Sequence, residues 1–266
     1  MTISAQGLTK EFTRRAAGAV FTAVEPVDLQ VECGELVLLK GRSGSGKSTL
    51  VSMLAGVLAP TAGRVLLDGE DLYSLSEVEL SSLRNEKIGL VPQGHAALRS
   101  LSVVENVILP AVLSTKGAVG PERGLELLEA VGMSALADAS PSELSGGELR
   151  RMGVARALMM DPKVVLADEP TAGLDEENAV MVLEMLRRAA DEGRAVVVAT
   201  HEEEATRFAD RVLHMVKGCL REDGGGRRRT ELGQREAHRG RVLASRSGGP
   251  CLPGQGPGGL ARGRVH

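Results

Sequence analysis

A glycine-rich loop is the part of this sequence whose residue types and spacing are best suited to chemistry. It runs Gly41-Arg42-Ser43-Gly44-Ser45-Gly46-Lys47-Ser48, between an apolar run at 36–40 and a helical pattern at 48–57. Glycines let such a loop wrap closely, so that backbone N–H groups point at phosphate oxygens, and the following helix adds its positive end. A chance glycine-rich turn is the alternative, but the expected strand and helix on either side favour a phosphate-binding loop.

Three side chains at the end of this loop are placed to complete a nucleotide site. We expect Lys47 to reach the β- and γ-phosphates, Ser48 to offer its hydroxyl to Mg²⁺, and Thr49 to contact the inner phosphate. The other ATP-binding residues that we expect are Gly41, Ser43, Gly44, Ser45 and Gly46. The loop therefore predicts that ATP and Mg²⁺ are the cofactors.

Two adjacent carboxylates end an apolar run further along the chain. Residues 164–167 are predicted to be a buried strand, and Asp168 and Glu169 follow it. Ligands of parallel sheets gather at the carboxyl ends of the strands, so both acids are well placed. Asp168 is suited to hold Mg²⁺ through water, and Glu169 to orient or deprotonate the water that attacks the γ-phosphate. Strands ending in two acids are common, and it is the glycine-rich loop that favours this interpretation.

A third motif, Leu144-Ser145-Gly146-Gly147-Glu148, precedes a helical pattern at 148–159. A hydroxyl, bare backbone N–H groups and a helix N-terminus face one point there, which is a second phosphate-binding surface. An ordinary helix cap followed by a glycine bend is the alternative. The motif resembles the signature sequence of the ABC ATPase family, in which this surface closes over the γ-phosphate held by the other subunit.

The resemblance covers residues 3–221 and assigns roles to three further residues. Gln93 follows the strand predicted at 88–91 and matches the family's glutamine that senses Mg²⁺ and couples to the membrane domain. His201 follows the strand predicted at 195–200 and matches the histidine that contacts the γ-phosphate. Asp175 matches the loop that joins the two subunits' sites. The resemblance thus implies catalytic roles for Glu169, His201 and Gln93, with Ser48, Gln93 and Asp168 at the metal.

Recognition of adenine is expected to depend on an aromatic side chain upstream of the loop, as in the family. Phe12 holds the matching place after the first strand, and Phe21 is the alternative. Either residue can instead belong to the core, since stacking contributes only about 0.5–1.5 kcal/mol beyond burial. We predict Phe12, with Phe21 left open.

The elements that must position these motifs alternate between short apolar runs and longer helical patterns, which is typical of an α/β fold with a parallel sheet. A final hairpin is expected at 211–220. The resemblance implies an ABC ATPase domain at 1–221, of the phosphate-loop class. It would have a RecA-like parallel-sheet core, an N-terminal antiparallel β subdomain and an inserted helical subdomain at about 94–160.

The last segment, 222–266, differs in composition from the rest of the chain. It holds nine arginines against four acidic residues and twelve of the 33 glycines, with almost no periodic apolar residues. Such a composition buries too little surface to offset the entropy of ordering, and it lacks aromatic residues to stack on bases. We expect a disordered tail and no nucleic-acid partner.

The length and the apolar runs of the chain indicate how many domains it has and whether it crosses a membrane. The 266 residues allow one α/β domain, and no apolar run approaches the roughly 18 residues that span a bilayer. Cys33, Cys219 and Cys251 show no paired spacing, so neither a metal site nor a disulfide is predicted. We expect a cytoplasmic protein, and the resemblance implies that it lies on the inner face of the membrane beneath separate permease subunits, as a homodimer or paired with a second ATPase.

Within the family, the segments 43–50, 105–107, 141–144 and 166–171 resemble the lipoprotein-releasing and macrolide-exporter group. That resemblance implies export or mechanical transport driven by ATP hydrolysis, with the substrate contacts on another chain. Two alternatives stay open: a regulatory ABC ATPase of the cell-division type, and a soluble ABC ATPase outside transport. The latter class carries a second ATPase domain, a coiled coil or a zinc insertion, and the sequence has none of these signals.

Overall fold

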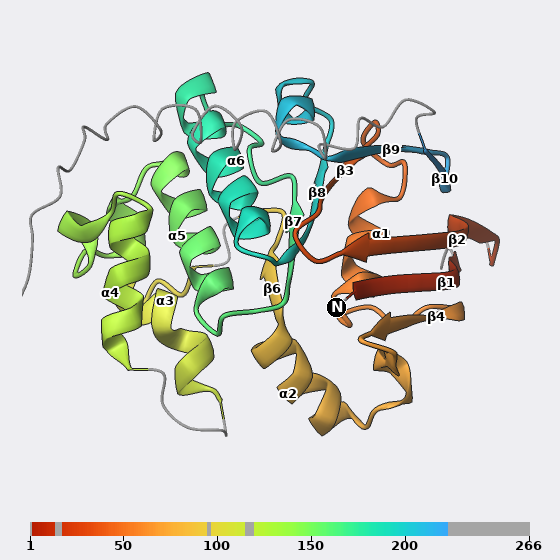
Figure 1. Cartoon of the computed structure of the whole chain (residues 1–266), viewed down its shortest axis with the longest axis horizontal. Coiled ribbons are helices and arrows are strands. Elements are labelled where there is room, and N and C mark those ends of the chain that lie inside the picture. The colour runs from red at the N-terminus through yellow and green to blue at the C-terminus, as the bar shows by residue number, and fades with distance from the viewer. Residues whose placement is uncertain (1, 14–17, 95–96, 115–119, 223–266) are drawn as a thin grey trace, which may run out of the picture. The chain divides into compact units, whose positions relative to one another are not determined.

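The computed structural model describes residues 2–13, 18–94, 97–114 and 120–222, which fall within one compact unit. Of the predicted tail, all but Glu222 lies outside the described residues, so the tail stays a prediction. The described part confirms the α/β class. Figure 1 shows a central sheet with a small antiparallel sheet on one side of it and a group of helices on the other.

The central sheet is parallel except for its last strand, and its strands run in the order β10-β9-β3-β8-β7-β6. Strands β3, β7 and β8 are buried along their whole length, as expected for parallel strands covered on both faces. The bounds are β3 (Leu36–Lys40), β6 (Ile88–Val91), β7 (Val164–Asp168), β8 (Ala195–Thr200), β9 (Arg211–Val216) and β10 (Cys219–Glu222). The predicted strands and the final hairpin are confirmed, with β7 one residue longer than expected.

The second sheet is antiparallel, in the order β2-β1-β4-β5, and corresponds to the N-terminal β subdomain implied by the resemblance. Its strands are β1 (Thr2–Thr13), β2 (Val20–Glu32), β4 (Ala62–Leu67) and β5 (Glu70–Asp71). A short 3₁₀ turn, η1 (Leu72–Ser74), and helix α2 (Glu77–Lys87) lead from this sheet to β6.

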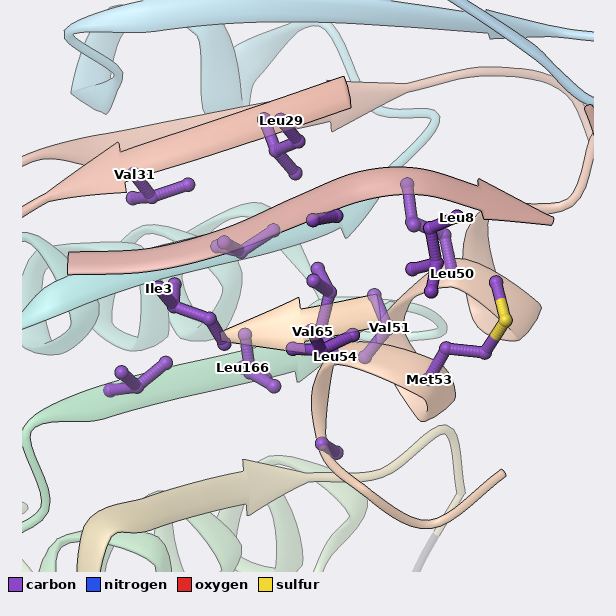
Figure 2. Packing of buried hydrophobic residues seen from close by; sticks show 14 of the residues in the cluster. Ile3, Leu8, Leu29, Val31, Leu50, Val51, Met53, Leu54, Val65 and Leu166 are labelled. Carbon is purple, nitrogen blue, oxygen red and sulfur yellow. The ribbon is translucent and has the colours of Figure 1, made fainter. Parts of the chain in front are cut away.

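Helix α1 (Lys47–Leu54) is wedged between the two sheets (Figure 2). Leu50 and Leu54 are buried against Ile3 and Val65 of the antiparallel sheet and Leu166 of the central one. Burial of each such side chain contributes about 1.5–3 kcal/mol. This packing fixes the start of α1, and with it the position of Lys47.

The described helices between β6 and β7 form a group with its own buried cluster, which includes Val107, Leu128 and Met152. The group consists of α3 (Val103–Val112), α4 (Pro121–Ala130), η2 (Ser134–Leu136), η3 (Pro141–Glu143) and α5 (Gly146–Leu158). We retain 94–160 as a proposed helical subdomain. The remaining helices, α6 (Glu176–Asp191) and η4 (Glu204–Phe208), belong to the central core. In the described residues, no helix is both long and apolar enough to cross a membrane.

The bounds of α1 and α5 differ from the expected 48–57 and 148–159, most of all at the end of α1 and the start of α5. Helix α1 ends at Leu54 and not at Val57, because Gly56 takes a left-handed φ of 67° that stops the helix. Helix α5 begins at Gly146, two residues early, because Ser145 caps it.

Candidate functional site

The glycine-rich loop joins the carboxyl end of β3 to α1, and its glycines are required by close backbone contacts. Gly46 has a φ of 110°, and a Cβ atom there would lie 2.4 Å from the carbonyl oxygen of Ala23. A Cβ on Gly41 would lie 2.4 Å from the carbonyl oxygen of Met215. The loop is thus pressed against β2 and β9, and its shape excludes side chains at both positions.

Lys47 lies inside this loop and is only 5% exposed. Its Nζ donates to the carbonyl oxygen of Gly41 at 2.6 Å and lies 3.1 Å from Oε1 of Glu169. The lysine is therefore already placed within the loop, held by a backbone carbonyl and a carboxylate.

Glu169 follows the end of β7 in a strained conformation. Its φ is 48°, which costs energy for a residue with a side chain, and its backbone N–H donates to Ala199 O at 2.7 Å. The contact to β8 holds the residue in this conformation. One carboxylate oxygen faces Lys47, and the other lies 3.0 Å from Nδ1 of His201. Glu169 thus connects a buried lysine with a histidine whose side chain is 61% exposed.

Asp168 lies beside Ser48, whose side chain hydrogen-bonds the carboxyl group. Burial raises the pKa of Asp168, and the hydrogen bond from Ser48 opposes this rise. The Oδ1 atom is buried without a hydrogen-bond partner among the described residues. A carboxylate oxygen and a hydroxyl are the ligands that Mg²⁺ prefers, and the unpaired oxygen fits such an ion. Among the described residues, no group of three or more His, Cys, Asp or Glu side chains is arranged to hold a metal ion.

One hollow at the surface brings most of the predicted nucleotide residues together. It is lined by Phe12, Phe21, Thr22, Ala23, the loop residues 43–49, Gln93, Glu169, Lys217 and Gly218. Phe12 and Phe21 are cross-strand neighbours, with ring centroids 5.8 Å apart and stacked. Both aromatic residues therefore line the hollow, and the choice between them stays open.

The signature residues Leu144 to Glu148 are absent from the lining of this hollow. Ser145 instead caps α5: its Oγ accepts from the Glu148 N–H at 3.3 Å, and its own N–H donates to Glu148 Oε2 at 2.7 Å. The helix-cap interpretation is therefore correct within one chain. Ser145 and Gly146 at the start of α5 are exposed nonetheless, although the Ser145 hydroxyl also donates to Glu148 Oε2 at 2.7 Å.

Asp175 is joined to the signature motif through one residue. It caps α6 by accepting from the Asn178 N–H at 2.9 Å, and both its carboxylate oxygens bind the Asn178 side chain. A Cβ on Gly147 would lie 2.7 Å from Asn178 Oδ1. The starts of α5 and α6 are thus in close contact.

Two contributors to the site were missed from the sequence. The turn of the last hairpin supports the loop, since the Gly218 N–H donates to Ser45 O at 2.9 Å. Arg150 is buried and donates to the carbonyl oxygens of Pro92 and Gly94, on either side of Gln93. The only sequence signal for Arg150 is its position two residues after the signature motif.

Comparison with known proteins gives a consistent result. Residues 24–172 match the family model described as ABC transporter. The lipoprotein-releasing system ATP-binding protein LolD of Xanthomonas oryzae is 44% identical over 223 residues, covering 83% of this chain and 90% of its own. The protein of that name from Bacteroides thetaiotaomicron is 37% identical, covering 83% and 100%. A solved dimer of the ATP-binding cassette MJ0796 with ADP and Pi is similar with a TM-score of 0.77 and 32% identity, covering 84% of this chain and 99% of that one.

Proposed function

The chain belongs to the ABC transporter family of ATP-binding subunits, and from this we propose that the Lys47, Glu169 and His201 array is its hydrolytic centre. The chain is an ATPase that drives a separate membrane permease. The observation that carries the residue assignment is the pairing of both Glu169 oxygens, one with Lys47 and the other with His201.

Lys47 binds the β- and γ-phosphates, with the backbone N–H groups of 43–49 around them. To do so, Lys47 exchanges its contacts with Gly41 and Glu169 for phosphate oxygens. That exchange releases Glu169 from its ion pair. The released carboxylate oxygen is then free to accept a hydrogen bond or a proton from water.

Glu169 then orients and deprotonates the attacking water, while His201 holds the carboxylate on its other side and contacts the γ-phosphate. The left-handed backbone at Glu169, tied to β8, keeps its side chain at the strand ends where Lys47 and His201 meet. Removal of the base should reduce turnover by about 10²–10⁴-fold.

Ser48, Asp168 and Gln93 would hold Mg²⁺, with Asp168 acting through water. The ion supplies neutralisation of charge on the β- and γ-phosphate oxygens. The support for this assignment is the unpaired, buried Oδ1 of Asp168 next to Ser48, together with the hollow that both Ser48 and Gln93 line.

The site is completed by a second ATPase copy. Within one chain the signature residues lie apart from the loop, but Ser145 and the N-terminus of α5 are exposed and suited to a phosphate. We assign Ser145, Gly146 and Gly147, with Leu144 and Glu148 shaping the cap, to the γ-phosphate held by the partner. Asp175, linked through Asn178 to Gly147, joins the two sites.

We propose that the transported material is lipoprotein and that a separate permease moves it mechanically. This chain would bind that permease at the inner face of the membrane. The support is the name of the relatives that cover most of the chain, which also favours transport over the regulatory alternative. The test is to purify the tagged chain from detergent-solubilised membranes of its own cells and to identify the retained membrane protein by mass spectrometry. Retention of a lipoprotein-releasing permease is expected, and retention of a cell-wall regulator in its place would contradict the proposal.

A further inference from the structure

Arg150 is a buried arginine on α5, the helix that begins at the signature motif and is called the signature helix below, and its guanidinium donates to the backbone that follows β6. It is 6% exposed, and its Nη1 donates to Pro92 O at 3.3 Å and to Gly94 O at 3.2 Å. These two carbonyl groups belong to the residues immediately before and after Gln93. The guanidinium therefore binds the backbone on both sides of Gln93, the residue assigned to Mg²⁺. Gln93 itself is exposed.

Stability alone is a poor reason for this arrangement. Nε of Arg150 is buried without a hydrogen-bond partner in the described residues, and burial lowers the pKa of the guanidinium. A buried charge that is incompletely paired costs free energy. The negative groups that act on Arg150 are Asp168 and Glu169, whose charges oppose the lowering of its pKa. The guanidinium of Arg150 is thus near enough to Asp168 and Glu169 to interact with their charges.

Arg150 also lies in a helix that begins at the signature motif. Ser145 caps α5, and Arg150 is on the second turn of the same helix. A rigid helix transmits displacement of its first turn to its second. Movement of Ser145 against a partner's nucleotide would therefore displace the two carbonyl groups that flank Gln93.

We propose that Arg150 is a positioning residue for ATP hydrolysis, which locks the Gln93 backbone to the signature helix so that Gln93 reaches Mg²⁺ only when the helix is seated. The inference rests on the proposed function, because it takes the roles of Gln93 and Ser145 from there. It adds a physical connection between the residue at one nucleotide and the surface that meets the other.

The test compares three purified variants with the parent enzyme. Arg150→Met removes both hydrogen bonds and the charge at similar length, and Arg150→Lys keeps the charge with a single donor group. Arg123→Met is the matched control: Arg123 also uses its guanidinium on α5 backbone carbonyls, donating from Nε to Met159 O at 2.9 Å and from Nη2 to Leu158 O at 3.4 Å, but at the far end of that helix.

Four quantities are measured: kcat, KM for ATP, the Mg²⁺ concentration for half-maximal rate, and the Mg²⁺ concentration for ATP-dependent dimer formation in a Glu169→Gln background. For Arg150→Met we expect kcat to fall by about tenfold or more and both Mg²⁺ midpoints to rise several-fold, with KM changed by less than about threefold. Arg150→Lys should be intermediate. Arg123→Met should leave all four quantities within about twofold, even where its melting temperature falls.

The proposal is overturned if Arg150→Met keeps kcat and both Mg²⁺ midpoints within about twofold of the parent, or if Arg123→Met shifts them equally. Should Arg150→Met fail to fold, Arg150→Lys is judged by the same criteria. A parent enzyme without ATPase activity would contradict the proposed function itself, whereas normal parent activity with unchanged Arg150 variants would remove only this inference.

Discussion

Lys47 and Glu169 form a buried ion pair, with Nζ 3.1 Å from Oε1 and the side chains only 5% and 9% exposed. The residue proposed to bind phosphate is therefore paired with the residue proposed to act on water. Each neutralises the charge of the other, and in the proposed function phosphate takes the place of the carboxylate. This pairing explains how a carboxylate and an ammonium group can lie together in the interior, and it makes them energetically dependent on one another.

That dependence predicts the stability of single and double variants. Lys47→Met should leave Glu169 buried without its cation and lower the free energy of unfolding by about 3 kcal/mol or more, with loss of ATP binding. Adding Glu169→Gln should recover much of this stability but none of the ATP binding, because the unpaired charge is gone and the lysine is still missing. Chemical denaturation of the parent, Lys47→Met, Glu169→Gln and the double variant measures the coupling free energy between the two residues. A double variant no more stable than Lys47→Met would contradict the pairing.

Two glycines of the loop should respond differently to alanine. At Gly46 the new methyl group would meet Ala23 O at 2.4 Å, so we expect Gly46→Ala to displace the loop and abolish ATP binding. Gly44 is the matched control, because its φ of 74° is also left-handed but nothing lies within 4 Å of a Cβ there. Gly44→Ala should lose only about 1–2 kcal/mol of stability from backbone strain. Equal loss of ATP binding in the two variants, measured by calorimetry, would show that the contact with Ala23 is unimportant.

Elements that depend on interactions between residues close in sequence are predicted well from the sequence, and features that depend on distant segments are not. The bounds that the sequence predicts for β3, β6 and β8 are correct because each strand is a short, largely apolar run followed by a glycine, a proline or a polar residue. The helical pattern predicts a start of α5 two residues too late because glycine is a weak helix former, whereas the cap by Ser145 begins the helix at Gly146. Gly56 is itself a local signal that α1 stops before Val57, because glycine readily takes the left-handed conformation that ends a helix.

The missed parts of the site depend on contacts between distant segments. The N–H of Gly218 supports Ser45, which only the pairing of β9 with β3 makes possible. The contacts of Arg150 with Pro92 and Gly94 require α5 to lie against the end of β6. The spacing of residues along the sequence contains no information on either of these two contacts. The stacked pair of Phe12 and Phe21 likewise follows from the register of β1 and β2.

Asp168 should destabilise the nucleotide-free protein at neutral pH. Burial raises its pKa, so the folded state binds the proton more tightly than the unfolded state. Stability is then lost as pH rises from the unfolded value of about 3.9 through the raised folded pKa. Asp168→Asn removes the charge and still accepts from Ser48. We expect its melting temperature to rise by about 2–4 °C at pH 7, a gain that shrinks as pH falls towards about 4.

The same variant should lose Mg²⁺-dependent hydrolysis, because the carboxylate proposed to hold the ion is gone. Asp138→Asn, at an exposed position, is the control and should change neither quantity. A melting temperature for Asp168→Asn below that of the parent at pH 7 would contradict the burial argument.

If each site is shared between two copies, mixing two inactive variants should recover part of the ATPase activity. Lys47→Ala disables the loop half of each site, and Ser145→Arg places a bulky side chain where the partner's phosphate must bind. Each variant alone should be inactive. An equal mixture would contain heterodimers with one intact composite site, giving up to about a quarter of the parent ATPase rate for independent sites and random pairing in a symmetric dimer. Melting curves check that both variants are folded, and an inactive mixture would argue against shared sites.

The most direct measurement of the central claim is size-exclusion chromatography of Glu169→Gln with and without ATP and Mg²⁺. The amide keeps the shape of Glu169 but cannot serve as a base, and it no longer pairs with Lys47 as an ion. We therefore expect ATP to bind at least as tightly as in the parent, hydrolysis to fall by about 10²–10⁴-fold, and an ATP-bound dimer to accumulate from monomer. A variant that hydrolyses ATP at a near-normal rate, or that binds ATP and stays monomeric, would contradict the account.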